Sequence, residues 1–292
     1  MKKVIIFSIL LVSLSGIIFA QGIYFRAGAG YGLPVASSSI GENYLYIEVA
    51  GSPQDDENSS ESVSASYGAG TNFSFAIGYK FNENLILDIN MLYLVGRKFE
   101  TSDIYSYTDG AYLENDDLTS TSYSRGLFLN PSIIFSSGFG KRAPYARIGI
   151  IAAFPKVTED DYYYAFDGVT DTDDIRWEYG GGMGIGFQTA VGINWEITDK
   201  LDIYSEIDFV GMTYYAKEGN RTKYISNGED ILDRFSVFQN NISYEKEYDS
   251  STSYDPTKPQ VSLSESRAFS SISAQVGIRL TIWNRKDKLS DY

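Results

Sequence analysis

The sequence predicts an all-β fold, a single eight-stranded antiparallel up-and-down barrel. Apolar and polar residues alternate with a period of two in eight separate runs, which is the pattern of strands in a two-faced sheet. The segments that join these runs alternate between short turns and long, polar stretches. The chain has 292 residues, of which 43% are hydrophobic, so one large all-β unit can bury a core.

The first twenty residues have the pattern of a secretory signal peptide. Lys2 and Lys3 precede an apolar stretch at 4–14, and Ala20 offers a small residue at the cleavage position. We expect residues 1–20 to be removed and the rest to be exported. An uncleaved anchor helix is the alternative, which is disfavoured because a membrane span needs about 20 apolar residues.

The first predicted strand, 23–31, places Ile23, Phe25 and Ala27 on one face and small or polar residues on the other. Helical spacing explains none of the runs, whereas a period of two does. Short segments at 234–238 and 242–244 could add a hairpin, so ten strands is the alternative count. Seven further strands are predicted at 71–81, 85–96, 124–136, 144–155, 181–196, 201–215 and 268–283.

Three connections are short, at 82–84, 137–142 and 198–200. Because short and long connections alternate, all short turns fall at one end of an antiparallel sheet, together with both termini. This segregation is typical of transmembrane barrels, which have tight periplasmic turns and longer extracellular loops. We therefore predict a barrel at 21–283 in the outer membrane of a Gram-negative-type envelope and a short periplasmic tail at 284–292. The extracellular loops are predicted at about 32–70, 97–123, 156–178 and 216–267.

Aromatic residues support this orientation, because they lie on the apolar face at both ends of the predicted strands. Amphipathic rings gather at the two interfaces of a membrane. A soluble barrel with its apolar face inward is the alternative. The predicted interface residues are Phe81, Phe135, Trp195 and Trp283 at the short-turn ends, and Tyr31, Tyr93, Phe154 and Tyr215 near the long loops.

The opposite, polar face of the strands predicts the barrel interior, with four cations and four anions. An isolated charge there is costly, whereas a hydrogen-bonded pair is tolerated, and eight strands enclose a space that side chains can fill. We expect a closed, salt-bridged interior in which inward glycines leave room for long side chains. A narrow channel in which the charges exchange partners is the alternative. The predicted network is Arg26, Lys80, Asp88, Arg147, Asp202, Glu206, Asp208 and Arg279.

The signal peptide, the eight alternating strands and a last strand that ends Ile278-Arg279-Leu280-Thr281-Ile282-Trp283 resemble the small outer-membrane β-barrels of the OmpA/OmpX-like type. The resemblance covers about 22–283. It implies outer-membrane lipid and the barrel assembly machinery as partners, since members end in a strand whose final aromatic residue that machinery recognises. Trp283 matches this residue, although nine residues follow it here. A monomer is expected, because a closed barrel has no free edge.

The composition excludes several classes of function. The chain has no His and no Cys, which excludes Ser-His-Asp and Cys-His nucleophiles and thiolate metal sites. A net charge of −14 argues against nucleic acid. Glu206 and Asp208 could be mistaken for a catalytic carboxylate pair, but an occluded interior offers no substrate cleft. We expect no enzyme, no cofactor and no metal site, while weak divalent-cation binding by the acidic loops, for example at 171–174, stays open.

The long loops are acidic and rich in tyrosine, and the loop at 32–70 has no Lys or Arg. Exposed Tyr, Asn and Ser are typical of adaptable binding surfaces. We therefore expect a non-enzymatic barrel that is structural or binds an unknown extracellular ligand through its loops, in the manner of an adhesin. A small porin-like channel for ions or small solutes is the alternative.

Overall fold

The computed structural model describes residues 22–52, 56–138, 141–247 and 254–284, without the side chains of the last two. The predicted signal peptide and all of the predicted tail except Asn284 lie outside the described residues. In the described part of the chain, no helix is long and apolar enough to cross a membrane.

The all-β prediction is confirmed, but seventeen strands form one mixed sheet in place of a clean eight-stranded barrel. Eight of them contain the predicted runs: β1 (Gly22–Pro34), β4 (Gly70–Lys80), β5 (Leu85–Gly96), β7 (Tyr112–Ser136), β8 (Arg142–Phe166), β10 (Gly184–Thr198), β11 (Leu201–Tyr215) and β17 (Ser271–Asn284). The other nine are β2 (Ser38–Val49), β3 (Glu57–Ala65), β6 (Phe99–Asp109), β9 (Thr170–Gly180), β12 (Glu218–Ser226), β13 (Glu229–Asp230), β14 (Asn241–Glu245), β15 (Gln260–Leu263) and β16 (Ser266–Ala268).

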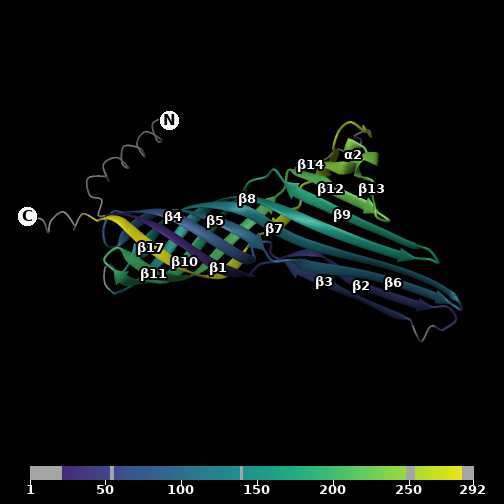
Figure 1. Ribbon diagram of the computed structural model, residues 1–292, viewed down its shortest axis with the longest axis horizontal. Helices are drawn as coiled ribbons and strands as arrows, with labels where there is room; N and C mark the ends of the chain where they lie inside the picture. Colours follow the sequence, from purple (N-terminus) through teal and green to yellow (C-terminus); the bar gives the residue numbers. More distant parts are fainter. Residues whose placement is uncertain (1–21, 53–55, 139–140, 248–253, 285–292) are drawn as a thin grey trace, which may run out of the picture.

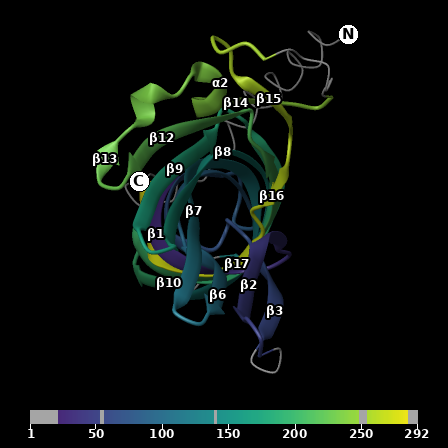
Figure 2. The same cartoon turned by 90° about the vertical axis from the view of Figure 1, so that its right-hand side faces the viewer.

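The eight strands with predicted runs are joined by antiparallel pairings in the order β1–β4–β5–β7–β8–β10–β11–β17, and β17 pairs with β1 again. We call this part the ring; Figure 2 looks along its axis. Its three short turns, the start of β1 and the end of β17 lie at one end, as predicted (Figure 1). The closure is partial for the sheet as a whole, because β7 and β8 continue beyond the ring and pair there with strands that do not close.

The long connections lie between the expected strands, but they are not irregular loops, because most of their described residues form further strands. β7 and β8 have 25 residues each and stay paired as far as Asn115 and Phe166, well beyond the ring. β6 and β2 extend this pairing on one side, and β9 and β12 extend it on the other. Alternating Ser, Thr and Tyr residues in these segments favour strands. We call the strands β2, β3, β6, β9, β12, β14 and β15, with residues 112–124 of β7 and 156–166 of β8, the distal sheet (Figure 1).

The distal sheet makes the whole assembly mixed, because β2 pairs with β6 in parallel and β14 pairs with β15 in parallel. The alternative of a fifth hairpin is also wrong. Leu232–Arg234 is a 3-10 helix, Val237–Asn240 is one short helical turn (α2), and β14 pairs with β12 and β15. A capping box at Ser236 and Gln239 begins that helical turn.

Candidate functional site

The ring has its apolar side chains outside and its polar side chains inside. On β4, for example, Phe73, Phe75 and Ile77 are exposed, whereas Ser74 and Ala76 between them are buried. All eight residues of the predicted network lie on the inner side. Seven of them are at most 8% exposed, and the side chain of Arg279 is 12% exposed.

Glu206 is the centre of this network. It accepts hydrogen bonds from Arg147, from Arg26 at 3.3 Å and from the Tyr145 hydroxyl at 2.9 Å. Arg26 also lies 3.9 Å from Asp88, which accepts a bond from the Tyr24 hydroxyl at 2.6 Å. Two cations and two anions therefore neutralise one another in the middle of the ring.

A second group lies nearer the short turns. Arg279 donates to Asp202 at 2.7 Å, and the Lys80 ammonium donates to the Thr281 hydroxyl at 3.3 Å. The aromatic ring of Tyr24 lies near both cations, with its centroid 5.6 Å from the Arg279 guanidinium and 5.8 Å from the Lys80 ammonium. The aromatic face favours both positive charges. The structure thus brings the predicted network together as two clusters, and Asp208 belongs to neither.

Three buried tyrosines complete the packing, and each one fills the space left by an inward glycine. A Cβ at Gly78 would overlap Tyr24, a Cβ at Gly28 would overlap the Tyr204 hydroxyl, and a Cβ at Gly192 would overlap Tyr145. The sequence analysis predicted that inward glycines leave space, but it did not identify the three tyrosines that fill this space. The alternation of the strands could have identified them, because Tyr24, Tyr145 and Tyr204 lie on the same inward face as the charged residues.

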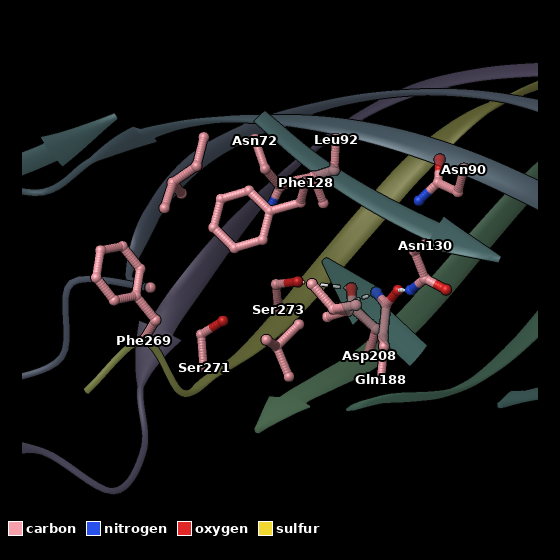
Figure 3. A pocket seen from close by; sticks show the side chains of 14 residues that line it. Asn72, Asn90, Leu92, Phe128, Asn130, Gln188, Asp208, Phe269, Ser271 and Ser273 are labelled. Atoms are coloured by element: carbon pink, nitrogen blue, oxygen red, sulfur yellow. Dashed lines mark hydrogen bonds between the residues drawn. The ribbon is translucent and has the colours of Figure 1, made fainter. Parts of the chain in front are cut away.

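Asp208 lies further from the short turns than Glu206, among neutral groups. It accepts hydrogen bonds from Ser273 at 2.6 Å, from Gln188 at 2.9 Å and from Gln275 at 3.1 Å. A cavity of about 20 Å³ lies next to it (Figure 3). The polar lining of this cavity is Asn72, Asn90, Asn130, Gln188, Asp208, Ser271 and Ser273, and the apolar side chains in its wall are Leu92, Leu94, Phe128, Ile151, Val210 and Phe269.

An aromatic cluster closes the interior at the distal end. Phe269 is fully buried, and its ring centroid is 5.7 Å from Tyr214, 5.8 Å from Tyr67 and 6.4 Å from Phe128. The backbone of Phe269 donates to the Met212 carbonyl at 2.9 Å. The segment before β17 therefore holds an aromatic plug across the distal mouth of the ring, which the sequence did not predict.

The residues predicted for membrane interfaces lie at the two ends of the ring. Tyr31, Tyr93, Phe154 and Tyr215 are about half exposed near the distal end. Phe135 is exposed at the opposite end, and Phe81 and Trp195 are partly exposed there. Trp283 pairs with Ile23 through the backbone at that end.

The acidic residues at 171–174 serve to join two strands of the distal sheet. Lys223 bonds to Asp174, the Tyr224 hydroxyl donates to Asp173 at 3.1 Å, and the Asn227 amide donates to Asp171 at 2.9 Å. Among the described residues, no three Asp or Glu side chains are placed to hold a metal ion together.

Tyrosine rings and carboxylates share the surface of the distal sheet. Tyr46 lies with its ring centroid 5.4 Å from Tyr105 and 6.4 Å from Tyr44, in nearly parallel planes. The Tyr46 hydroxyl donates to Glu48 at 2.8 Å, and this bond raises the pKa of Tyr46 to about 12. Between β9 and β12, Arg221 lies 5.3 Å from the Trp177 ring. The stacked tyrosines and the adjacent Glu48 show that the sheet offers ordered aromatic rings next to negative charge.

No family model matches this chain, and no curated protein matches it. The crystal structure of CarO2 from Acinetobacter baumannii is similar at 11% sequence identity and a TM-score of 0.27, covering 89% of this chain and 99% of that chain. A TM-score this low establishes neither a shared fold nor a shared function.

Proposed function

We propose that the ring is an eight-stranded transmembrane barrel of the outer membrane and that the distal sheet binds a partner outside the cell. The role is non-enzymatic, in keeping with a chain that has no His and no Cys. The barrel holds the sheet at the membrane surface, and the sheet makes the contact.

The apolar outer face of the ring supports the proposal that the ring crosses the membrane. Ile150 is 65% exposed, Ile185 is 63% exposed and Val191 is 62% exposed. In water an apolar surface that surrounds a protein would drive aggregation, whereas hydrocarbon solvates it. The circuit of pairings also satisfies the backbone polar groups, as a lipid environment requires. Further exposed apolar residues of this face are Phe73, Phe75, Ile77, Leu87, Ile89, Met91, Leu127, Ile133, Ile148, Phe187, Ile203, Ile207, Ile272, Val276, Ile278 and Leu280.

Strand length supports a distal sheet outside the bilayer. A tilted strand crosses the hydrocarbon with about 9–11 residues, and β7 and β8 have 25 each. About half of each strand, residues 112–124 of β7 and 156–166 of β8, is left to project beyond the membrane. The short turns then face the periplasm. The start of β1 and the end of β17 lie on the same side, as expected for a chain that is exported and then inserted from the periplasm.

The composition of β6 and of the adjoining half of β7 supports a basic partner on this side of the distal sheet. Between residues 99 and 124 the chain has six Asp or Glu and no Lys or Arg. Such a field steers a cationic partner toward the sheet. Tyr44, Tyr46 and Tyr105 add rigid, amphipathic contact area that costs little conformational entropy on binding.

The filled interior supports a binding role over the porin-like alternative. The Glu206 cluster occupies the middle of the ring, and the plug around Phe269 occupies its distal mouth. A cavity of about 20 Å³ lies between them, which is far smaller than a solute path. A resting conductance is therefore not expected.

The test uses cells that display the chain and an immobilised polylysine surface as the probe. A triple variant, with Tyr44→Ser, Tyr46→Ser and Tyr105→Ser, keeps every charge and removes the rings. We expect adhesion of the wild type and a several-fold loss in the variant, while heat-shifted gel mobility shows that both barrels fold. Equal adhesion would reject the tyrosine surface as the binding site. A large, steady single-channel current from the refolded chain in a planar bilayer would reject the closed barrel in favour of a channel.

A further inference from the structure

We propose that the cavity between the Glu206 cluster and the aromatic plug binds one monovalent metal cation of about the size of Na⁺, held by Asp208 and by side-chain oxygens of the neighbouring asparagines. This site is independent of any partner that the distal sheet binds. Three observations support the inference: the balance of charges inside the ring, the buried polar atoms without a hydrogen-bond partner, and the size of the cavity.

The charge balance leaves Asp208 without a cation. Arg26 and Arg147 are neutralised by Asp88 and Glu206, and Arg279 is paired with Asp202. Asp208 is 1% exposed, and no ion pair to it is found among the described residues. A buried charge without a counter-charge is costly, and three neutral hydrogen-bond donors do not remove its net charge.

The remaining interior cation cannot reach Asp208. The Lys80 ammonium bonds to Thr281, whereas Asp208 bonds to Ser273 on the same strand. These two positions on β17 are eight residues apart, which is roughly 26 Å at ~3.3 Å per residue. A neutralising charge for Asp208 therefore has to come from elsewhere.

Three asparagines in the wall of the same cavity have side-chain atoms without a hydrogen-bond partner. Among the residues that the structure describes, neither side-chain polar atom of Asn90 has a partner, and the Oδ1 atoms of Asn72 and Asn130 also lack one. All three residues are at most 4% exposed. Asn90 and Asn130 lie with Gln188 and Asp208 at one end of the pocket, and Phe269 lies at the other (Figure 3). Carboxylate, amide and hydroxyl oxygens together are the ligands that hard cations prefer.

The size of the cavity selects the ligand. A volume of about 20 Å³ holds one water-sized sphere, so an alkali cation fits and an organic ammonium ion does not. One carboxylate balances one positive charge. The apolar wall and Phe269 exclude bulk water, which strengthens the attraction between the cation and the carboxylate.

The experiment measures urea unfolding of the mature chain in neutral phospholipid vesicles, in NaCl or in choline chloride at equal ionic strength. A cation that binds only the folded state stabilises it by mass action. Above the dissociation constant, each tenfold increase in Na⁺ should raise the ratio of folded to unfolded protein roughly tenfold. Asp208→Asn keeps the shape of the side chain and should abolish this dependence.

Two further variants keep the result interpretable. Asp202→Asn removes a carboxylate from the same strand but from another cluster, so its stability should fall while its response to Na⁺ persists. Asn90→Leu, which removes the unpartnered amide, should weaken the response. Identical unfolding of the wild type in NaCl and choline chloride would mean that a water molecule or a proton satisfies the site, and the proposal would be overturned. An unchanged Na⁺ response in Asp208→Asn would overturn it as well.

Discussion

Glu206 in the ring and Glu178 in the distal sheet each lie between two cations, but in opposite surroundings. Glu206 contacts Arg26 at 3.3 Å and also contacts Arg147, and none of the three side chains is more than 4% exposed. Glu178 contacts Lys156 at 2.5 Å and Arg125 at 3.8 Å, and these cations are 46% and 51% exposed.

The difference shows what holds each region together. Inside the ring, each charge has to be matched, because water cannot replace a lost partner. On the distal sheet, water and salt screen the same kind of contact, so it adds little to stability. The ring therefore depends on the matched charges of the Glu206 cluster and on tight packing. The distal sheet depends on its strand pairings and leaves its side chains available.

The largest expected effect follows from removing the two glutamates. Glu206→Ala leaves Arg26 and Arg147 buried without their carboxylate and should lower the free energy of unfolding by about 3–5 kcal/mol. Glu178→Ala should lower it by about 0–1 kcal/mol. Urea unfolding in vesicles measures both. Similar losses for the two variants would mean that water reaches Glu206 and that the interior is not closed.

The second comparison concerns packing around glycine. A Cβ at Gly78 would overlap the aromatic ring of Tyr24, whereas a Cβ at Gly180, in the distal sheet, would meet no atom of the described part of the chain within 4 Å. Overpacking a filled interior costs typically about 1–3 kcal/mol. Gly78→Ala should therefore lower the free energy of unfolding by about that amount, with Gly180→Ala close to the wild type. A neutral Gly78→Ala would show that Tyr24 can move aside and that the interior is less tightly packed than the contacts indicate.

The same contrast explains how much the sequence could predict. Period-two alternation located all eight ring strands, because each strand separates an apolar outside from a polar inside, and a shift of one residue would exchange the two faces. The four interior cations and four anions were found for the same reason. The tyrosines that fill the glycine spaces and Phe269 in the plug were missed, since their role depends on contacts between strands distant in the sequence.

The distal sheet was not predicted because buried apolar residues occur in its strands only near the ring, for example Val157 and Tyr179, and form no long alternating run. In β3, for example, eight of the nine residues are polar or small, and most are exposed. Such segments are taken for loops when the sequence is considered alone. They form strands because β7 and β8 continue beyond the ring and offer free edges to β6 and β9. Tertiary context, more than local pattern, decides their structure.

The smallest expected effect tests the border between the two regions, where Glu159 lies on β8 just beyond the ring. Burial raises the pKa of this carboxyl, and Asp161 and Glu265 act in the same direction, against Tyr179 and Arg267. The folded protein then keeps a proton that the unfolded chain has already lost, so stability should fall as pH rises above the ordinary carboxyl pKa of about 4.3.

Glu159→Gln should flatten this part of the stability profile, measured by urea unfolding at a series of pH values. Glu178→Gln, which removes a carboxylate whose two cation partners are about half exposed, should leave the slope in place. If both variants flattened the profile equally, the slope would belong to the overall charge of the distal sheet, and Glu159 would be as open to water as the surface that surrounds it.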